Sequence, residues 1–183
     1  MARIVLVTGG CRSGKSAYAQ QLAESLPPPR LFVATCPVTD DEIGCRIERH
    51  RQARRERGWE TVEEQIDLPG VLQSHVHHNA ILIDCVTLWV NNLMYWADRE
   101  TRPFSEAEIA ARVCRTLDAA AMWRGSLIFV TSEVGLGVAP ENAQARRYRD
   151  LVGRANQILA ARADSVTLVC CGIPLHLKGE SAP

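Results

Sequence analysis

The chain has 183 residues, of which 46% are hydrophobic and 23% are charged, enough for one α/β domain with a sizeable core. Lysine plus arginine and aspartate plus glutamate both total 21, so no overall field favours nucleic acid or an acidic membrane surface. No apolar run approaches the roughly 18–20 residues of a membrane span, and the seven cysteines form no C-x-x-C pair, so we expect a cytoplasmic protein with reduced thiols and no zinc site.

Predicted strands and helices alternate along the chain. Apolar, β-branched runs predict strands buried on both faces at 3–8, 31–35, 80–84, 126–131 and 165–171. Helices are predicted at 16–26, 41–57, 67–77, 86–97, 105–123 and 141–163. The N-terminus passes directly into the first strand, so we expect no signal peptide. This pattern is typical of an α/β fold with a mostly parallel central sheet flanked by helices on both faces. We expect a single domain over 1–183, with a frayed tail at 179–183.

A phosphate-binding loop follows the first predicted strand. Residues 9–16 read GGCRSGKS, which fits the pattern G-x-x-x-x-G-K-S between a strand and a helix-prone stretch. The glycines allow backbone N–H groups to converge on phosphate oxygens. Lys15 can reach the β- and γ-phosphates, and the Ser16 hydroxyl suits a Mg²⁺ ligand. We therefore expect a nucleoside triphosphate site, rather than a glycine-rich turn with a solvated lysine.

Two carboxylates follow predicted strands and should lie beside this loop. Asp84 ends the strand 80–84, and ligands in open α/β sheets bind beyond the carboxyl ends of the strands. We expect Asp84 to hold Mg²⁺ directly or through water, although it could also cap the helix 86–97. Glu133 follows the strand 126–131 in the same way and is the weaker candidate.

A basic stripe distinguishes the predicted helix 41–57. Arg46, His50 and Arg54 are spaced i, i+4, i+8 and would share one helical face. Neighbouring arginines would keep the His50 ring neutral and nucleophilic, and could clamp phosphate oxygens. This arrangement suits a histidine that carries a nucleotide fragment covalently. From the residues alone, however, a basic surface helix with an incidental histidine is the simpler interpretation, and a helix that contacts nucleic acid is another.

Two further groups have mainly structural interpretations. His75, His77 and His78 lie in a polar stretch without a nearby cysteine partner, so we favour a structural role over a metal site. Trp89 and Leu93 are spaced i, i+4 on a predicted helix, and we expect core packing rather than a platform for a cofactor.

The chain resembles the bifunctional adenosylcobinamide kinase / adenosylcobinamide-phosphate guanylyltransferase family of cobalamin biosynthesis. The resemblance runs in family order from about residue 4 to residue 178. Its most specific parts are the segment around His50 and the Glu-Val-Gly segment at Glu133. The matching segments are the phosphate loop 9–16, Asp41-Glu42, Arg46-Ile47-x-x-His50-Arg51, Trp59-x-Thr61-Val62-Glu63, 84–93, 133–142, 149–157 and 172–175.

The resemblance implies two reactions. In the first, the terminal phosphate of ATP or GTP is transferred to the aminopropanol hydroxyl of adenosylcobinamide. In the second, GTP is attacked at its α-phosphate, pyrophosphate leaves, and GMP passes to adenosylcobinamide phosphate, giving adenosylcobinamide-GDP. In the family a histidine carries GMP as a phosphoramidate, and the motif places that role on His50.

The resemblance also implies a RecA-type fold, a homotrimer and a set of site residues. The catalytic residues would be His50 and Lys15, and Ser16 and Asp84 would bind Mg²⁺. Nucleotide contacts would come from Gly9, Gly10, Cys11, Arg12, Ser13, Gly14, Lys15, Ser16, Thr35, Cys36, Pro37, Arg51, Gln52, Ala53, Arg54, Glu63 and Asp84. The chain departs from the family at Cys11, where alanine is expected, at Cys36-Pro37 and at Ala143. Pro37 has no N–H to donate.

Other classes of function account for fewer of these residues. A regulatory GTPase would need an Asn-Lys-x-Asp segment, which the sequence lacks. A phosphate-loop kinase of another small molecule would explain Lys15, Ser16 and Asp84 but not the stripe of Arg46, His50 and Arg54. A nucleic-acid-dependent ATPase would explain that stripe, but the net charge of zero argues against it.

Overall fold

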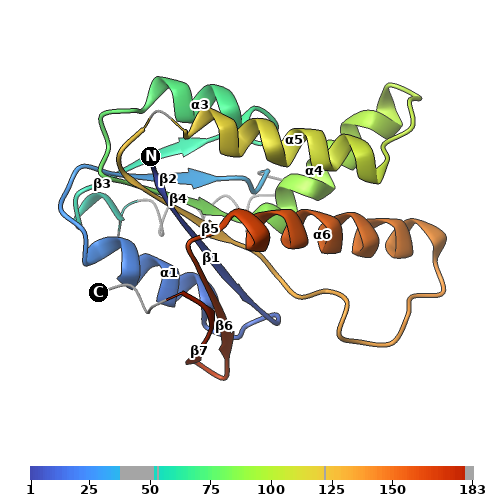
Figure 1. Cartoon of the computed structure of the whole chain (residues 1–183). Coiled ribbons are helices and arrows are strands. Elements are labelled where there is room, and N and C mark those ends of the chain that lie inside the picture. Colours follow the sequence, from blue (N-terminus) through green and yellow to red (C-terminus); the bar gives the residue numbers. More distant parts are fainter. Residues whose placement is uncertain (38–51, 53, 122, 180–183) are drawn as a thin grey trace.

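The computed structural model describes residues 1–37, 52, 54–121 and 123–179. A seven-stranded sheet with the order β3-β2-β4-β5-β1-β6-β7 runs through it (Figure 1). The strands are β1 (Arg3–Gly9), β2 (Arg30–Ala34), β3 (Trp59–Glu63), β4 (Ala80–Asp84), β5 (Ser126–Val130), β6 (Ser165–Cys170) and β7 (Ile173–Lys178). All neighbouring pairs are parallel except β6 and β7, which are antiparallel. The predicted α/β class with a mostly parallel sheet is confirmed.

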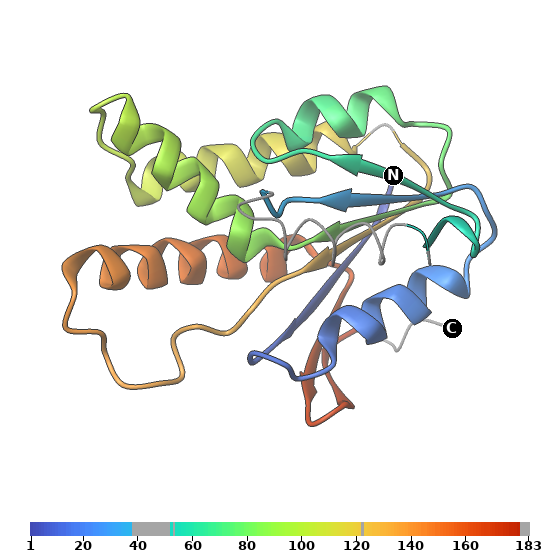
Figure 2. The same ribbon diagram turned by 180° about the vertical axis from the view of Figure 1, so that it is seen from behind.

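Helices cover both faces of the sheet, as expected. They are α1 (Lys15–Glu24), α3 (Leu68–Ser74), α4 (Val86–Arg99), α5 (Glu106–Ala119) and α6 (Ala143–Arg162). On one face, Ala19 and Ala23 of α1 pack against Val7, Leu82 and Ile128 of the sheet (Figure 2). On the other face, α3, α4, α5 and α6 enclose a larger cluster with the opposite sides of the same strands. Strands sandwiched in this way are apolar on both faces, which explains their continuous hydrophobic runs.

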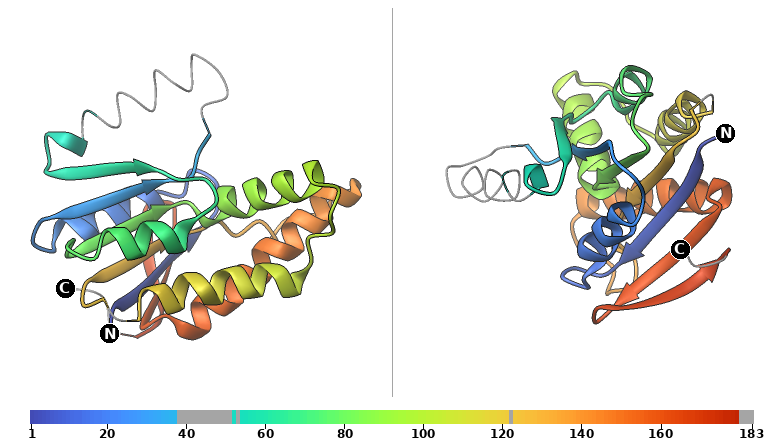
Figure 3. Two further views of the ribbon diagram at one scale, coloured as in Figure 1. Left: turned by 90° about the horizontal axis from the view of Figure 1, so that it is seen from above. Right: turned by 90° about the vertical axis from the view of Figure 1, so that its left-hand side faces the viewer.

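The predicted elements agree with the structure to within a few residues, with two omissions. Strand β3 was not predicted because its sequence, WETVE, mixes apolar and polar residues and forms no unbroken apolar run. This composition suits an edge strand with one open side. Strand β7 was not predicted because every one of its residues is exposed and it contains Pro174, which an edge strand tolerates. These strands form the two edges of the sheet (Figure 3).

Several predicted helices end earlier than expected. The helix predicted at 67–77 ends at Ser74, and the one predicted at 105–123 ends at Ala119. Most of the predicted helix 41–57 lies outside the described residues; of its described positions, 52, 54 and 55 are helical and 56–58 form a turn. The predicted frayed tail also lies outside the described residues, apart from Gly179.

Two expectations from composition agree with the described part of the chain. The six cysteines that it contains are free thiols. None of its helices combines the length and the apolar character that a membrane crossing requires.

Candidate nucleotide and phosphoryl-transfer site

The carboxyl ends of the parallel strands bring the predicted site residues to one edge of the sheet. Strand β1 leads into the phosphate loop, and β4 ends at Asp84, which is level with Val130 of β5 and Ala34 of β2. Ala34 in turn pairs with Glu63 at the end of β3. Ligands of open α/β sheets bind at this edge, where the strand ends meet the starts of the helices.

The backbone of the phosphate loop is shaped by two of its glycines. Gly14, the N-cap of α1, has a φ of 94°, and a Cβ added there would lie 3.2 Å from the Cα of Gly172. At Gly9 an added Cβ would collide with the carbonyl oxygen of Val169. The Gly172 N–H donates to the Ser13 carbonyl oxygen over 2.8 Å, so the turn between β6 and β7 buttresses the loop. Only glycine fits these two positions without strain.

The loop side chains are arranged around the start of α1. The Lys15 Nζ donates to the Gly10 carbonyl oxygen over 3.0 Å, so the ammonium group folds back over the loop. Among the described residues, Ser13 Oγ is the one buried side-chain nitrogen or oxygen atom without a hydrogen-bond partner in the protein. The first turn of α1 contains no acidic residue, so its positive dipole end is uncompensated there. A phosphate group would satisfy this arrangement of charge and donors.

Asp84 and Ser16 contact each other, as the Mg²⁺ hypothesis requires. The Ser16 hydroxyl lies near the Asp84 carboxylate. Burial raises the pKa of Asp84, and the Ser16 hydroxyl and the positive charges of Lys15 and Arg54 oppose that rise. A hydroxyl and a carboxylate are hard oxygen donors of the kind that Mg²⁺ prefers, so this pair fits the ion. The alternative role as a helix cap is not observed, because Cys85 is the N-cap of α4.

Glu133 also lies beside the phosphate loop, held by residues of β1 and α6. Its backbone N–H donates to the Gly9 carbonyl oxygen over 3.2 Å. Its Oε1 accepts from Thr8 Oγ1 over 3.0 Å and from Asn156 Nδ2 over 3.3 Å. Asn156 also accepts from Thr131 Oγ1 over 2.7 Å. The sequence reasoning assigned no role to Asn156; the signal for it is an amide on the buried face of the long helix α6.

Thr35 is fully buried, and its polar atoms are used within the protein. Its Oγ1 donates to the Cys85 carbonyl oxygen over 2.9 Å and accepts from the Cys85 N–H over 2.8 Å. Its carbonyl oxygen accepts from Asn92 Nδ2 over 2.8 Å. These bonds join the ends of β2 and β4. Its predicted contact with nucleotide, like those of Cys36 and Pro37 beside it, stays a prediction.

Of the basic stripe, Arg54 lies among the described residues, and its charge acts on Asp84 at this edge of the sheet. Arg54 is 7% exposed, its guanidinium carbon lies 3.8 Å from the centre of the Phe32 ring, and its Nε donates to Thr61 Oγ1 over 3.5 Å. Gln52 is exposed and bonds to Glu56 over 3.4 Å. His50, Arg46, Arg51 and Ala53 lie outside the described residues, so their predicted roles stay predictions.

An open groove lies between α4 and α6. It encloses about 450 Å³ and is lined by Asn91, Met94, Tyr95, Asn142, Gln144, Ala145 and Tyr148. The Tyr148 hydroxyl donates to the Thr87 carbonyl oxygen over 3.1 Å, which connects the groove to the chain just after Asp84. Burial raises the pKa of Tyr148 to about 12, so the phenol stays protonated at neutral pH. Trp89 and Leu93 of α4, each 2% exposed, face the core as predicted.

The chain is similar to known proteins over nearly its whole length. A family model described as "Cobinamide kinase / cobinamide phosphate guanyltransferase" matches residues 5–177. The "Bifunctional adenosylcobalamin biosynthesis protein CobU" of Escherichia coli is 39% identical over 182 residues, covering 96% of this chain and 99% of that protein. The protein of the same name from Salmonella typhimurium is 37% identical over 188 residues, with the same coverage. The "Bifunctional adenosylcobalamin biosynthesis protein CobP" of Pseudomonas aeruginosa is 39% identical over 176 residues, covering 96% and 97%.

Among solved structures, an ATPase from the type III secretion system of pathogenic bacteria shares the fold. The TM-score is 0.57 at 12% sequence identity, and the match covers 91% of this chain and 50% of that one. This likeness supports the phosphate-loop ATPase type of fold. With the family match spanning residues 5–177, the chain belongs to the cobinamide kinase / cobinamide phosphate guanylyltransferase family.

Proposed function

We propose that this chain catalyses two successive reactions of cobalamin biosynthesis. In the first, the aminopropanol hydroxyl of adenosylcobinamide attacks the γ-phosphorus of ATP or GTP; the nucleoside diphosphate leaves and the hydroxyl proton is released. In the second, GMP is transferred from GTP to adenosylcobinamide phosphate, giving adenosylcobinamide-GDP and pyrophosphate. Family membership over nearly the whole chain supports both reactions, and the contact of Ser16 with Asp84 beside Lys15 is the observation that carries the proposal.

The phosphate loop would act in phosphoryl transfer mainly by positioning and by stabilising charge. Backbone N–H groups at the start of α1 would hold phosphate oxygens, and Lys15 would turn from the Gly10 carbonyl toward the β- and γ-phosphates. Ser16 and Asp84 would hold Mg²⁺, which neutralises charge that develops on the phosphate oxygens. Because the Asp84 carboxylate already lies near Ser16 and near two cationic side chains, little rearrangement of the protein is needed.

His50 would carry GMP in the second reaction. Its Nε2 or Nδ1 would attack the α-phosphorus of GTP, the bond to pyrophosphate would break, and a phosphoramidate would form. The phosphate of the acceptor would then displace the histidine. This role rests on the resemblance of the segment Arg46-Ile47-x-x-His50-Arg51 to the family. A supporting observation is that Arg54, three residues beyond this segment, lies close enough to Asp84 for its charge to oppose the rise in the pKa of that carboxyl.

The groove between α4 and α6 is the best candidate for part of the corrinoid acceptor. Its lining combines amide groups with the side chains of Met94 and Tyr95, and Tyr148 connects it to Thr87. A bulky acceptor with amide substituents would find both apolar surface and hydrogen-bonding partners there. We further propose a cytoplasmic homotrimer, on the basis of the resemblance to the family.

The proposal can be tested by labelling. The protein would be incubated with Mg²⁺ and GTP carrying a radioactive α-phosphate, then quenched and treated with acid or alkali. We expect a label on the wild type that is lost in acid and survives alkali, and no label on His50→Ala. The kinase reaction of His50→Ala, followed with γ-labelled triphosphate and adenosylcobinamide, serves as the control and should persist. No label on the wild type with intact triphosphate hydrolysis would contradict the guanylyl-transfer mechanism and leave a simple phosphate-loop kinase.

A further inference from the structure

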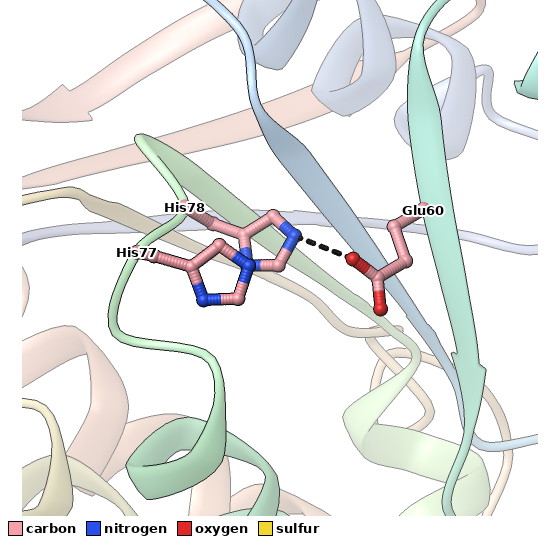
Figure 4. Close-up of side chains that lie close together, drawn as sticks. All are labelled: Glu60, His77 and His78. Carbon is pink, nitrogen blue, oxygen red and sulfur yellow. Dashed lines mark hydrogen bonds and ion pairs between the residues drawn. The ribbon is translucent and has the colours of Figure 1, made fainter.

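Three histidines and a carboxylate gather near the amino ends of strands β3 and β4, whereas the nucleotide site lies at the carboxyl ends of the strands. Glu60 projects from the start of β3, and His77 and His78 lie in the segment between α3 and β4 (Figure 4). One ligand atom from each of these residues lies within 4.8 Å of the other two. His75 lies beside this group of three, with its Nε2 3.7 Å from Glu60 Oε1. The sequence favoured a structural role for the histidines since no cysteine was near, but the missing partner is a carboxylate from another strand.

Hydrogen bonds at the far side of two rings fix which nitrogen faces the carboxylate. His78 Nδ1 lies 3.2 Å from the His75 carbonyl oxygen, and His75 Nδ1 lies 2.9 Å from the Val71 carbonyl oxygen. A carbonyl oxygen only accepts, so each Nδ1 carries the hydrogen, and in neutral imidazole each Nε2 then presents a lone pair. Both lone pairs face the oxygens of Glu60. A cation between the two lone pairs and the carboxylate would be attracted by all of them. Histidines that bind metals typically donate the N–H of their other ring nitrogen to an acceptor, as His75 and His78 do here.

The spacing of the donor atoms suits a transition metal. His78 Nε2 lies 3.0 Å from Glu60 Oε2, and two ligand atoms each about 2.0–2.1 Å from a tetrahedral ion lie about 3.3–3.4 Å apart, so this pair needs to separate by only a few tenths of an ångström. The His77 ring lies beside that of His78, with centroids 4.1 Å apart. Imidazole nitrogens with one carboxylate favour zinc, nickel or copper over Mg²⁺.

The segment that carries the histidines is held firmly. His78 is 2% exposed, and its carbonyl oxygen accepts from Trp123 Nε1 over 2.9 Å. Asn79 bonds to the carbonyl oxygens of Pro28, over 2.7 Å from its side chain, and Pro29, over 2.8 Å from its backbone N–H. A site built on such a support loses little freedom when an ion binds.

We propose that Glu60, His77 and His78 bind one divalent transition-metal ion per chain, with His75 beside them and zinc as the best match. The ion would tie the edge strand β3 to the segment before β4, across β2, which lies between them. Its role is structural, since it lies at the amino ends of β3 and β4, whereas the nucleotide site lies at the carboxyl ends of the parallel strands. An ion that binds only the folded chain stabilises that fold by mass action.

Calorimetric titration with Zn²⁺ tests the proposal on the full chain, after treatment with a chelator and in a buffer that contains Mg²⁺. The adjacent thiols Cys170 and Cys171 are exposed, and thiolates are good zinc ligands that would compete for the ion, so every protein in the series would carry both serine substitutions. We expect one ion per chain.

His77→Ala is the principal variant because His77 is exposed, and Glu60→Gln is the second. Each variant should weaken Zn²⁺ binding at least about tenfold. Replacing a residue that only supports a metal ligand already lowers metal affinity about 10–100-fold, and these residues would be ligands themselves. His176→Ala, a histidine on β7, is the matched control and should bind normally.

A second readout distinguishes the site from a simple ion pair between histidine and glutamate. Zn²⁺ should raise the Tm of the parent protein and of His176→Ala, but not that of His77→Ala. Co²⁺ bound in place of zinc should give visible d–d bands without a thiolate charge-transfer band. The proposal is overturned if the parent binds no stoichiometric ion, or if His77→Ala and Glu60→Gln bind it as tightly as the parent does.

Discussion

The Ser16 hydroxyl, in the first turn of α1, lies near the Asp84 carboxylate at the end of β4, although β5 separates β4 from β1, the strand that leads into α1. The start of α1 and the end of β4 therefore meet at this carboxylate. Burial opposes the ionisation of Asp84, whereas Ser16, Lys15 and Arg54 favour its ionised form. Such opposing influences on a carboxylate are typical of a site built to receive a cation.

Asp84→Asn should raise the stability of the protein relative to the wild type above about pH 4, while lowering both activities. A carboxyl whose pKa is raised by folding stabilises the fold fully below its unfolded pKa, near 4, and that contribution is lost as the pH rises through the raised pKa. Asparagine does not ionise, so the Tm of the variant minus that of the wild type should increase with pH above about 4 and then level off. Both activities should fall at least about tenfold, since a Mg²⁺ ligand is lost.

Thermal unfolding across the pH range, with and without Mg²⁺ and ATP, checks this expectation. Asp118→Asn, an exposed carboxylate on α5, is the control and should show a much flatter difference. A Tm difference for Asp84→Asn that stays constant with pH would show that burial does not govern the ionisation of Asp84. If Mg²⁺ and ATP raise the Tm of Asp84→Asn as much as they raise the Tm of the wild type, Asp84 does not bind the ion.

Thr35→Val tests whether Thr35 acts on the fold or on the nucleotide. Valine has nearly the same shape but leaves the Cys85 N–H without its partner, which should cost about 1–3 kcal/mol of unfolding free energy. Thr35→Ser keeps the hydroxyl and is the matched control. Denaturant unfolding measures the stability, and initial rates give KM for ATP and GTP. A raised nucleotide KM with unchanged stability would instead identify Thr35 as a direct nucleotide contact.

The central strands and the phosphate loop were predictable because their signals are local. Strands buried on both faces require unbroken apolar runs, and the phosphate loop is a short sequence motif. Asp84 was expected beside the loop because both follow the carboxyl ends of parallel strands, which meet at the same edge of the sheet. The edge strands β3 and β7 carried no such signal, since one side of each is open. Contacts between distant segments were equally hidden. Nothing near Glu133 in the sequence points to Asn156, and nothing near His78 points to Glu60, because only the pairing of strands and helices brings them together.

Asn156→Ala should impair both stability and catalysis. The amide of Asn156 joins Thr131, Ser132 and Glu133, and it is 9% exposed. Its removal leaves a buried hydroxyl without an acceptor, which should cost about 1–3 kcal/mol, and it releases the Glu133 carboxylate. Gln157→Ala, at the exposed neighbouring position, should change neither property by more than about 0.5 kcal/mol. If the Asn156 variant loses stability but keeps its kcat at a permissive temperature, Glu133 has no part in positioning the reacting groups.

Lys15→Ala tests whether both reactions use one nucleotide site. The Lys15 ammonium already contacts the loop carbonyl of Gly10, and alanine removes the charge without disturbing a buried group. We expect phosphoryl transfer and guanylyl transfer each to fall about 10²–10³-fold, the cost of losing one preorganised charge at a reacting phosphate. Initial rates of both reactions on the same preparation, with Tm as a check of folding, measure this directly. Because His50→Ala should remove guanylyl transfer alone, a Lys15 variant that loses only phosphoryl transfer would mean that GTP is attacked at a second site.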